Sequence, residues 1–465
     1  MQSIDTTSRP AAGTPASTHE AIERLVIEEV GRLGGRPNSF NASFAGLGID
    51  AGHFADVIHR IEARYGMRFH GEWLRGIDSW ADLVACIEQH LRDSLDSPRA
   101  AAAAVRPATT PGRGEILLTS TDYLGLSTHP DVIAAAKEAI DCFGCGLVPR
   151  GYHAAHEKLV GGLERRIARF LGVPRAAVFP AEHGPASAIF HQLAGPADLV
   201  LCDHLLPARL VRAAEASPAA CRLFRHGDLG QLDRLLREHR RSHRRAIIVV
   251  EGICGMTGEP ANLAGLVELR LRHEAMLCVD ESDSLGTLGG GRGLAHHVGI
   301  DRDEADLWIA SDWRAFGSGG GYVAGGDAVI RYLENVPPEV VRRGCPPPVA
   351  AAARGCLELL ERDPRPVRRL AERAELFRKL SADCDLEIGG SEGPVITIMP
   401  EPLQLGEAAG CQDAARLLLG RGVRLRAVRF PGIGFQAEGL QVRLTATIDE
   451  PQVAHAVASI AEVLA

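Results

Sequence analysis

One glycine-rich loop follows a buried strand, a place where a reactive lysine could lie. The basic residue in this loop is an arginine, which cannot act as a nucleophilic amine. The stretch DLWIASDWRAFGSGGGYVAGG, residues 306–326, is typical of a buried strand running into such a loop, and its basic residue is Arg314. A guanidinium stays protonated, with a pKa above about 12, so Arg314 cannot attack an aldehyde or take up a proton. The only lysines in the chain are Lys137, Lys158 and Lys379, all distant in sequence from this loop.

The cysteines and the overall charge favour an intracellular protein that does not bind nucleic acid. Cys142 and Cys145 form one CxxC without a second pair at zinc-site spacing, so we interpret them as buried thiols rather than a metal or redox site. The net charge of -8 argues against nucleic-acid binding. We find no apolar window of about 18 residues for a membrane span and no apolar core of a secretory signal. The expected location is therefore cytoplasmic.

Composition and periodicity divide the chain into five parts. Residues 1–19 are rich in Thr, Ser, Pro and Ala and read as a disordered leader, and residues 20–93 show helical periodicity. Residues 94–114 form an Ala/Pro/Arg linker. In residues 115–383 short apolar runs alternate with amphipathic helices, and residues 384–465 mix strands and helices in a smaller α+β domain.

The apolar runs of the large domain predict its architecture. They are AAVFPA, DLVLCD, CRLFRH, RAIIVVEG, AMLCVDES, DLWIAS and GYVAGG. Runs that are apolar throughout indicate strands buried on both faces, as in a parallel sheet covered by helices. The sequence therefore predicts an α/β fold with a mostly parallel central sheet.

From residue 115 onward, five segments in order resemble the α-oxoamine synthases, which have fold type I of the pyridoxal-phosphate (PLP) transferases. They are TDYLGLSTHPDVIAAAKEAI, GLVPRGYHAAHEKLVGGLERRIARFLG, FRHGDLGQL, VVEGICGMTGEPANLAGLVEL and VDESDSLGTLGGGRG. The family includes 8-amino-7-oxononanoate synthase and serine palmitoyltransferase. The resemblance implies an aminotransferase class I/II fold, PLP as cofactor, and condensation of an amino acid with an acyl thioester at a dimer interface.

The resemblance also shows that several cofactor residues are replaced. Arg314 stands at the position of the Schiff-base lysine, so PLP binding is doubtful and cannot be a Schiff base to this residue. Asp283 replaces a histidine beside the cofactor's phenolic oxygen, and Pro207 replaces the histidine that stacks on the ring, although a changed loop would bring His204 close. Asp280 matches the carboxylate facing the ring nitrogen; its alternative is an exposed aspartate that caps the next helix.

The phosphate and substrate positions are partly retained. His183 and Glu182 fall in the segment that matches the phosphate-binding turn, where a carboxylate would repel a phosphate. Arg150 is retained in the Gly-Ser-Arg element, and Arg443 falls on the arginine that usually binds the substrate carboxylate. The alternative for Arg443 is a surface strand residue that pairs with Asp449 or Glu450.

The N-terminal helical part resembles an acyl carrier protein. Its turn reads LGIDAG, and Ala51 stands where the serine that takes phosphopantetheine would be, so we expect no phosphopantetheine. The alternative is an unrelated three- or four-helix bundle.

Three functions remain open. The first is a catalytically impaired pseudoenzyme that forms a homodimer, or a heterodimer with an active α-oxoamine synthase, and contacts an acyl carrier protein or acyltransferase. The second is a PLP-dependent transferase working without a covalent lysine link. The third is a binding or scaffold protein.

Overall fold

The computed structural model describes Ser79, Asp82, Leu83 and the ranges 115–146, 154–180, 183–310, 314–335, 345–399, 410–430 and 438–464. The chain divides into two compact units, Met1–Thr110 and Pro111–Ala465. The predicted leader and linker lie outside the described residues, as does nearly all of the carrier-like part, so these assignments stay predictions.

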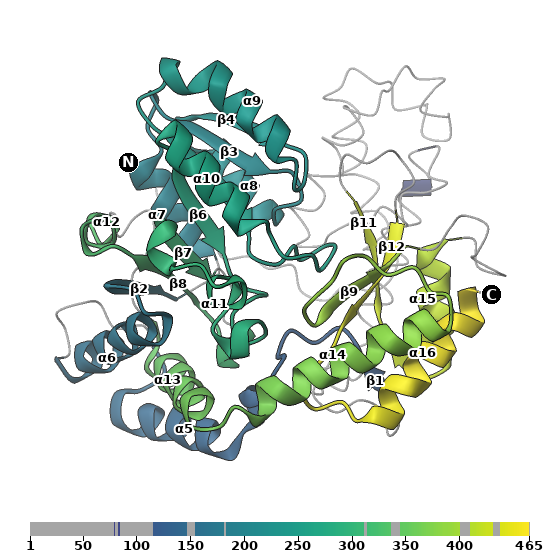
Figure 1. Cartoon of the computed structure of the whole chain (residues 1–465). Coiled ribbons are helices and arrows are strands. Elements are labelled where there is room, and N and C mark those ends of the chain that lie inside the picture. Colours follow the sequence, from purple (N-terminus) through teal and green to yellow (C-terminus); the bar gives the residue numbers. More distant parts are fainter. Residues whose placement is uncertain are drawn as a thin grey trace. The chain divides into compact units, whose positions relative to one another are not determined.

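A seven-stranded sheet forms the centre of the described part of the second unit, in the order β2-β8-β7-β6-β5-β3-β4 (Figure 1). The pairs β3–β4, β3–β5, β5–β6 and β6–β7 are parallel, and β8 runs antiparallel to both neighbours. The mostly parallel sheet is therefore confirmed. Its strands are β2 (Arg175–Phe179), β3 (Leu199–Asp203), β4 (Ala220–Phe224), β5 (Ala246–Glu251), β6 (Met276–Asp280), β7 (Leu307–Ala310) and β8 (Gly321–Gly325).

Two hydrophobic cores lie on opposite faces of this sheet. In β5 the side chains of Ile248 and Val250 enter one core, and those of Ile247 and Val249 enter the other, because successive residues of a strand point to opposite faces. Both faces are therefore covered by helices. One core includes residues of α6 (Ala154–Leu171), α9 (Leu229–His239), α10 (Leu263–His273) and α13 (Pro347–Arg362); the other includes α7 (His183–Leu193), α8 (Ala208–Glu215) and α12 (Asp327–Leu333).

The edge strand β4 departs from the predicted burial on both faces. Phe224 is buried in the first core, but Leu223 is 46% exposed. β4 ends the strand order and pairs only with β3 among the described strands, so one side of it faces away from the sheet.

The smaller domain is built around an antiparallel sheet of β11 (Arg426–Arg429), β12 (Glu438–Arg443) and β9 (Val395–Ile398). Its helices include α14 (Arg365–Asp383) and α16 (Glu450–Leu464), which run side by side in Figure 1. α14 therefore packs with the smaller domain although it precedes the predicted boundary at residue 384. The opening strand β1 (Ile116–Leu117) also pairs with this region, through β10 (Val423–Arg424). α15 (Cys411–Gly420) also belongs to this domain.

The loop after β5 touches the smaller domain through Gly258, where a side chain would clash with the backbone of β9. Gly258 has φ +84°, and a Cβ there would lie 2.0 Å from the Val395 carbonyl oxygen. We expect Gly258→Ala to lower the free energy of unfolding by more than about 3 kcal/mol, since strain and a backbone clash add together. The matched control is Gly299→Ala, with φ +70° and no atom within 4 Å, which should cost about 1–2 kcal/mol. Urea denaturation of both variants measures the difference, and equal losses would contradict the clash.

Candidate active site

Carboxylates gather where the parallel strands end. Asp203, Glu251 and Asp280 are the last residues of β3, β5 and β6, and Glu251 pairs directly with Asp280 across the sheet. All three are buried. The carboxyl edge of an open α/β sheet is where such folds bind ligands, so these residues mark the candidate site.

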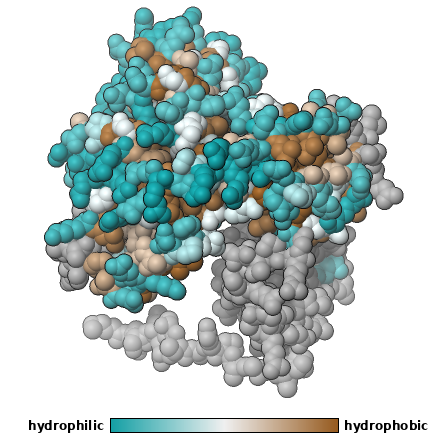
Figure 2. Space-filling view, turned by 60° about the horizontal axis from the view of Figure 1, so that its bottom comes forward, coloured by the Kyte–Doolittle hydropathy of each residue, from teal (hydrophilic) through white to brown (hydrophobic). Residues whose placement is uncertain are grey.

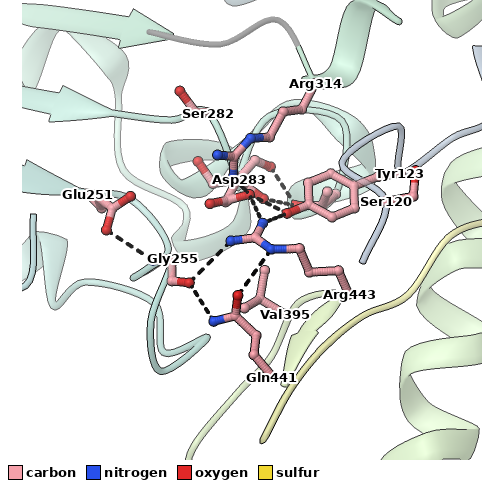
Figure 3. Close-up of polar contacts among 12 residues, drawn as sticks. Ser120, Tyr123, Glu251, Gly255, Ser282, Asp283, Arg314, Val395, Gln441 and Arg443 are labelled. Carbon is pink, nitrogen blue, oxygen red and sulfur yellow. Dashed lines mark hydrogen bonds and ion pairs between the residues drawn. The ribbon is translucent and has the colours of Figure 1, made fainter. Parts of the chain in front are cut away.

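A buried carboxylate, Asp283, joins side chains from three separate parts of the chain. It lies three residues beyond β6, is 2% exposed, and forms ion pairs with Arg314 and with Arg443, whose Nη1 is 3.0 Å away. The hydroxyl of Tyr123 also donates to it. Figure 3 shows Arg314, Arg443 and Tyr123 pointing toward Asp283 from different sides. We call these four residues the Asp283 cluster.

Arg443 reaches this cluster from the end of β12, so the alternative of a surface residue is wrong. Arg443 is 9% exposed, its Nη2 donates to the Gly255 carbonyl at 3.2 Å, and its Nε donates to Gln441. Glu450, the proposed surface partner, pairs with Arg373 at 2.7 Å instead. Antiparallel pairing with β9 and β11 on either side holds β12 and thereby aims Arg443 at the large domain.

The charges of the cluster determine its protonation. Burial alone would raise the pKa of Asp283, but the charges of Arg314 and Arg443 outweigh it and hold this pKa well below its usual range. Burial and the negative charge of Asp283 raise the pKa of Tyr123 far above its ordinary value. At neutral pH the cluster therefore contains a carboxylate, two guanidinium groups and a protonated phenol.

Asp280 is buried rather than an exposed helix cap. It is 1% exposed, and its Oδ1 accepts hydrogen bonds from the Ser282 backbone N–H at 2.9 Å and hydroxyl at 2.6 Å. Its Oδ2 lies 3.5 Å from the Arg209 guanidinium, whose Nε is buried without a hydrogen-bond partner. The carboxylate assigned to the ring nitrogen is thus already next to a permanent cation.

The other predicted positions are only partly placed. His183 is exposed at the start of α7, and Pro207 is half-buried at the N-cap of α8 with no side-chain hydrogen bond to the helix. Glu182, Arg150 and Ala51 lie outside the described residues. His204, the suggested substitute for the stacking histidine, instead accepts a hydrogen bond from the His226 backbone N–H at 2.8 Å. It is therefore held at the end of β4.

The residues of this site do not fit PLP in covalent linkage. All three lysines, Lys137, Lys158 and Lys379, are exposed on helices α5 (Pro130–Phe143), α6 and α14, so none can replace the missing amine. At the expected lysine position, Arg314 is engaged with Asp283. None of the three lysines is therefore placed to supply an amine at this site.

Sequence reasoning missed a second polar group at the same edge of the sheet. Asp203 is the last residue of β3, His226 follows β4 and Cys254 follows β5. The parallel strands bring these residues to the same edge of the sheet. His226 lies in FRHGDLGQL, which served only as a family landmark. Cys254 lies in VVEGICGMTGEPANLAGLVEL, which was likewise only a family landmark.

The CxxC does not form a buried pair. Cys142 and Cys145 are both exposed near the end of α5, so the interpretation as buried thiols is wrong. Among the described residues, no group of three or more His, Cys, Asp or Glu side chains is arranged to hold a metal ion. None of the described helices has the length and apolar character required to cross a membrane.

The chain is similar in sequence to known synthases over most of its length. The family model described as aminotransferase class I and II matches residues 113–460. The 8-amino-7-oxononanoate synthase of Geobacter sulfurreducens is 35% identical over 356 residues, which are 76% of this chain and 89% of that protein. The corresponding synthase of Cellvibrio japonicus is 31% identical over 355 residues, covering 76% of this chain and 87% of that protein.

Solved structures share the fold. Serine palmitoyltransferase of Sphingomonas wittichii superposes with a TM-score of 0.70 at 24% identity, covering 80% of this chain and 96% of that one. The 8-amino-7-oxononanoate synthase of Francisella tularensis gives a TM-score of 0.64 at 23% identity, covering 76% and 98%. Together with the sequence matches, the sheet topology and the ordered motifs, this shows that the chain belongs to the aminotransferase class I and II family and, within it, to the α-oxoamine synthases.

Proposed function

We propose that this chain is a catalytically impaired α-oxoamine synthase that serves as the partner subunit of an active one. The observation that carries the proposal is the ion pair between Arg314 and Asp283. These residues stand where the family has a lysine and a histidine. The two replacements complement each other in charge and are in contact, which indicates a site rebuilt for stability rather than one that lost a single residue.

The rebuilt site supports a role without amino-acid chemistry. A lone buried guanidinium or carboxylate is costly, and pairing lowers that cost. Arg314 neutralises Asp283, and Arg443, which matches the substrate-binding arginine, is bound to the same carboxylate. An amino-acid substrate would have to displace this internal partner. The retained sheet and cores support the proposal, because a chain that keeps its fold can still present a surface to a second chain.

A groove next to α5 is our candidate for the partner surface. A cavity of about 390 Å³ lies between α5, α6 and α13, with Phe143 and Leu159 among its apolar lining. Ala135 and Cys142, seven residues apart on α5, also line it, and Cys142 is exposed. Figure 2, which brings the lower side of Figure 1 forward, shows hydrophobic residues exposed on this face. We propose that a lysine-bearing α-oxoamine synthase docks here.

Co-purification tests both parts of this proposal. The tagged chain, expressed with a lysine-bearing α-oxoamine synthase from the same genome, should elute as a one-to-one heterodimer in native mass spectrometry. Ala135→Asp/Cys142→Asp should weaken the complex at least about tenfold, because both residues line the cavity and two charged groups would be buried at the interface. Leu271→Asp is the matched control, since Leu271 is 60% exposed on α10, and it should leave the complex intact.

Activity assays separate this proposal from its alternatives. The chain alone should show no turnover with serine and palmitoyl-CoA as one probe pair, and turnover would refute the impaired-enzyme assignment. The second candidate is suggested by Asp280, which remains a buried carboxylate at the end of β6. A saturable change in PLP absorption on titration would support that noncovalent alternative. An inactive chain that forms only homodimers and does not bind PLP would favour a scaffold.

A further inference from the structure

The end of the sheet formed by β3, β4 and β5 holds a cysteine, a histidine and an aspartate that line one cavity. His226 Nδ1 lies 3.0 Å from Asp203 Oδ2. The Cys254 thiol lines the same cavity as His226 and Asp203, and its charge interacts with that of His226. We call Cys254, His226 and Asp203 the thiol cluster. A nucleophile beside a base, with a carboxylate that orients the base, is the arrangement of enzymes that use an activated nucleophile.

Each member of the cluster is held by the surrounding backbone. Asp203 is 5% exposed, and its carboxylate also accepts hydrogen bonds from the Leu205 N–H at 2.9 Å and the Gly227 N–H at 3.2 Å. Cys254 is fixed because its backbone N–H donates to the Glu259 carbonyl at 2.8 Å. The cluster is therefore preorganised.

Electrostatics favour the charged form of the thiol–imidazole pair. Burial raises the pKa of Cys254, but the hydrogen bond and charge of His226, with the hydrogen bonds of Thr257, bring it below its ordinary value. Burial lowers the pKa of His226, and its hydrogen bonds with Asp203 and Cys254 outweigh this and raise it to about 10. The carboxylate of Glu259, 3.9 Å from His226 Nε2, acts in the same direction.

A cavity of about 200 Å³ gives small molecules access to the thiol. Cys254, His226 and Asp203 all line it. Cys254 itself is 2% exposed, whereas the side chains of His226 and Glu259 are 25% and 44% exposed, so the mouth lies on their side. The remaining walls are mostly apolar: Leu205, Leu206, Phe224, Leu229, Val250 and Leu266 contribute to them.

The lining indicates what kind of electrophile fits. Glu251 also lines the cavity, and burial followed by the charges of Cys254, Asp283 and Asp280 raises its pKa well above the ordinary value, which favours the protonated form that can donate to a carbonyl oxygen. Apolar walls and the Glu259 carboxylate at the mouth disfavour an anion. Thiolates exchange readily with thioesters because another thiolate leaves, whereas esters and amides have poorer leaving groups.

We propose that the thiol cluster accepts a short, neutral acyl group from a thioester. The Cys254 sulfur, having given its proton to His226, attacks the thioester carbonyl carbon. A bond forms between that carbon and the Cys254 sulfur, and the bond from the carbon to the departing sulfur breaks. The departing thiolate takes the proton held by His226, so the products are an acylated Cys254 and a free thiol. The reaction uses neither Arg314 nor Arg443 and does not depend on the proposed partner role.

Acetylation by the acetyl thioester of N-acetylcysteamine tests the proposal. The full-length protein should gain one acetyl group that peptide mapping places on Cys254, and this should occur at least about tenfold faster than at the exposed Cys142 or Cys384. Faster labelling of the exposed cysteines than of Cys254 would overturn the proposal. Cys254→Ser should lose this fast phase and keep the slow one.

Two further variants distinguish a reactive cluster from a structural one. With His226→Gln the acetylation rate of Cys254 should fall at least about tenfold and rise with pH as a free thiol does, whereas the wild-type rate should rise less steeply between about pH 6 and 8, because the pKa of Cys254 is lowered. An unchanged rate and pH profile would overturn the role of His226. Ala261→Phe narrows the cavity without altering the cluster and should also slow the reaction. Circular dichroism identifies any variant that has unfolded, and Ala261→Phe tests the site even if His226→Gln does not fold.

Discussion

Replacing Asp283 by alanine should lower the free energy of unfolding by about 3–5 kcal/mol, because it leaves the buried guanidinium groups of Arg314 and Arg443 without their shared carboxylate. The control is Glu268→Ala, which removes an exposed partner of Arg272 and should cost less than about 1 kcal/mol. Urea denaturation measures both. Similar losses in the two variants would show that the Asp283 cluster contributes no more than a surface ion pair.

The pH dependence of stability supplies an independent check of the same carboxylate. The pKa of Asp283 in the folded chain is held below its usual range, so its stabilising contribution is fully present above the unfolded pKa of about 3.9. As the pH falls below about 4 toward the folded pKa, that contribution is lost. The difference in unfolding free energy between wild type and Asp283→Asn should therefore shrink over this acidic range and stay constant between pH 6 and 8.

Restoring the lysine alone should not restore covalent PLP binding. In Arg314→Lys the new ammonium lies beside the Asp283 carboxylate, which favours its protonated form by about 1–3 pKa units and removes the nucleophile. In Arg314→Lys/Asp283→His this carboxylate is gone. We expect at least about tenfold more covalent adduct in the double variant, measured by mass after incubation with PLP and borohydride reduction.

Two comparisons make this experiment decisive. Asp283→His without lysine should give no adduct at residue 314, and the exposed lysines on α5, α6 and α14 provide the background level by peptide mapping. If the single variant Arg314→Lys reacts as well as the double variant, the two replacements are not coupled. Adduct formation in neither variant would place the remaining defect elsewhere, with Pro207 the first position to reverse.

The strands could be predicted because an apolar run indicates a strand that is buried on both faces. The run RAIIVVEG is apolar from Ala246 to Val250, and β5 indeed supplies both cores. The exception, β4, carries Arg222 within the strand, and its place at the edge depends on strand order, which no single run contains. The packing of α14 with α16 likewise depends on tertiary contacts and not on a composition change at residue 384.

The site was predictable as separate positions but not as an arrangement. Arg314, Asp283 and Arg443 were each identified from the family pattern, yet the sequence did not show that they touch, since Asp283 and Arg443 are 160 residues apart. Cys254 and His226 were missed because their proximity follows from the register of β3, β4 and β5 alone. Contacts that depend on register leave no local signal in a single sequence.

The contacts of Asp283 with three separate parts of the chain also affect how the protein unfolds. Tyr123 belongs to the segment after β1, Arg314 to the turn after β7 and Arg443 to the last position of β12. The smaller sheet therefore cannot swing away from the larger one without breaking a buried ion pair. A cross-link of this kind joins the two into one cooperative unit, so both sheets should melt in a single transition and their amides should exchange together.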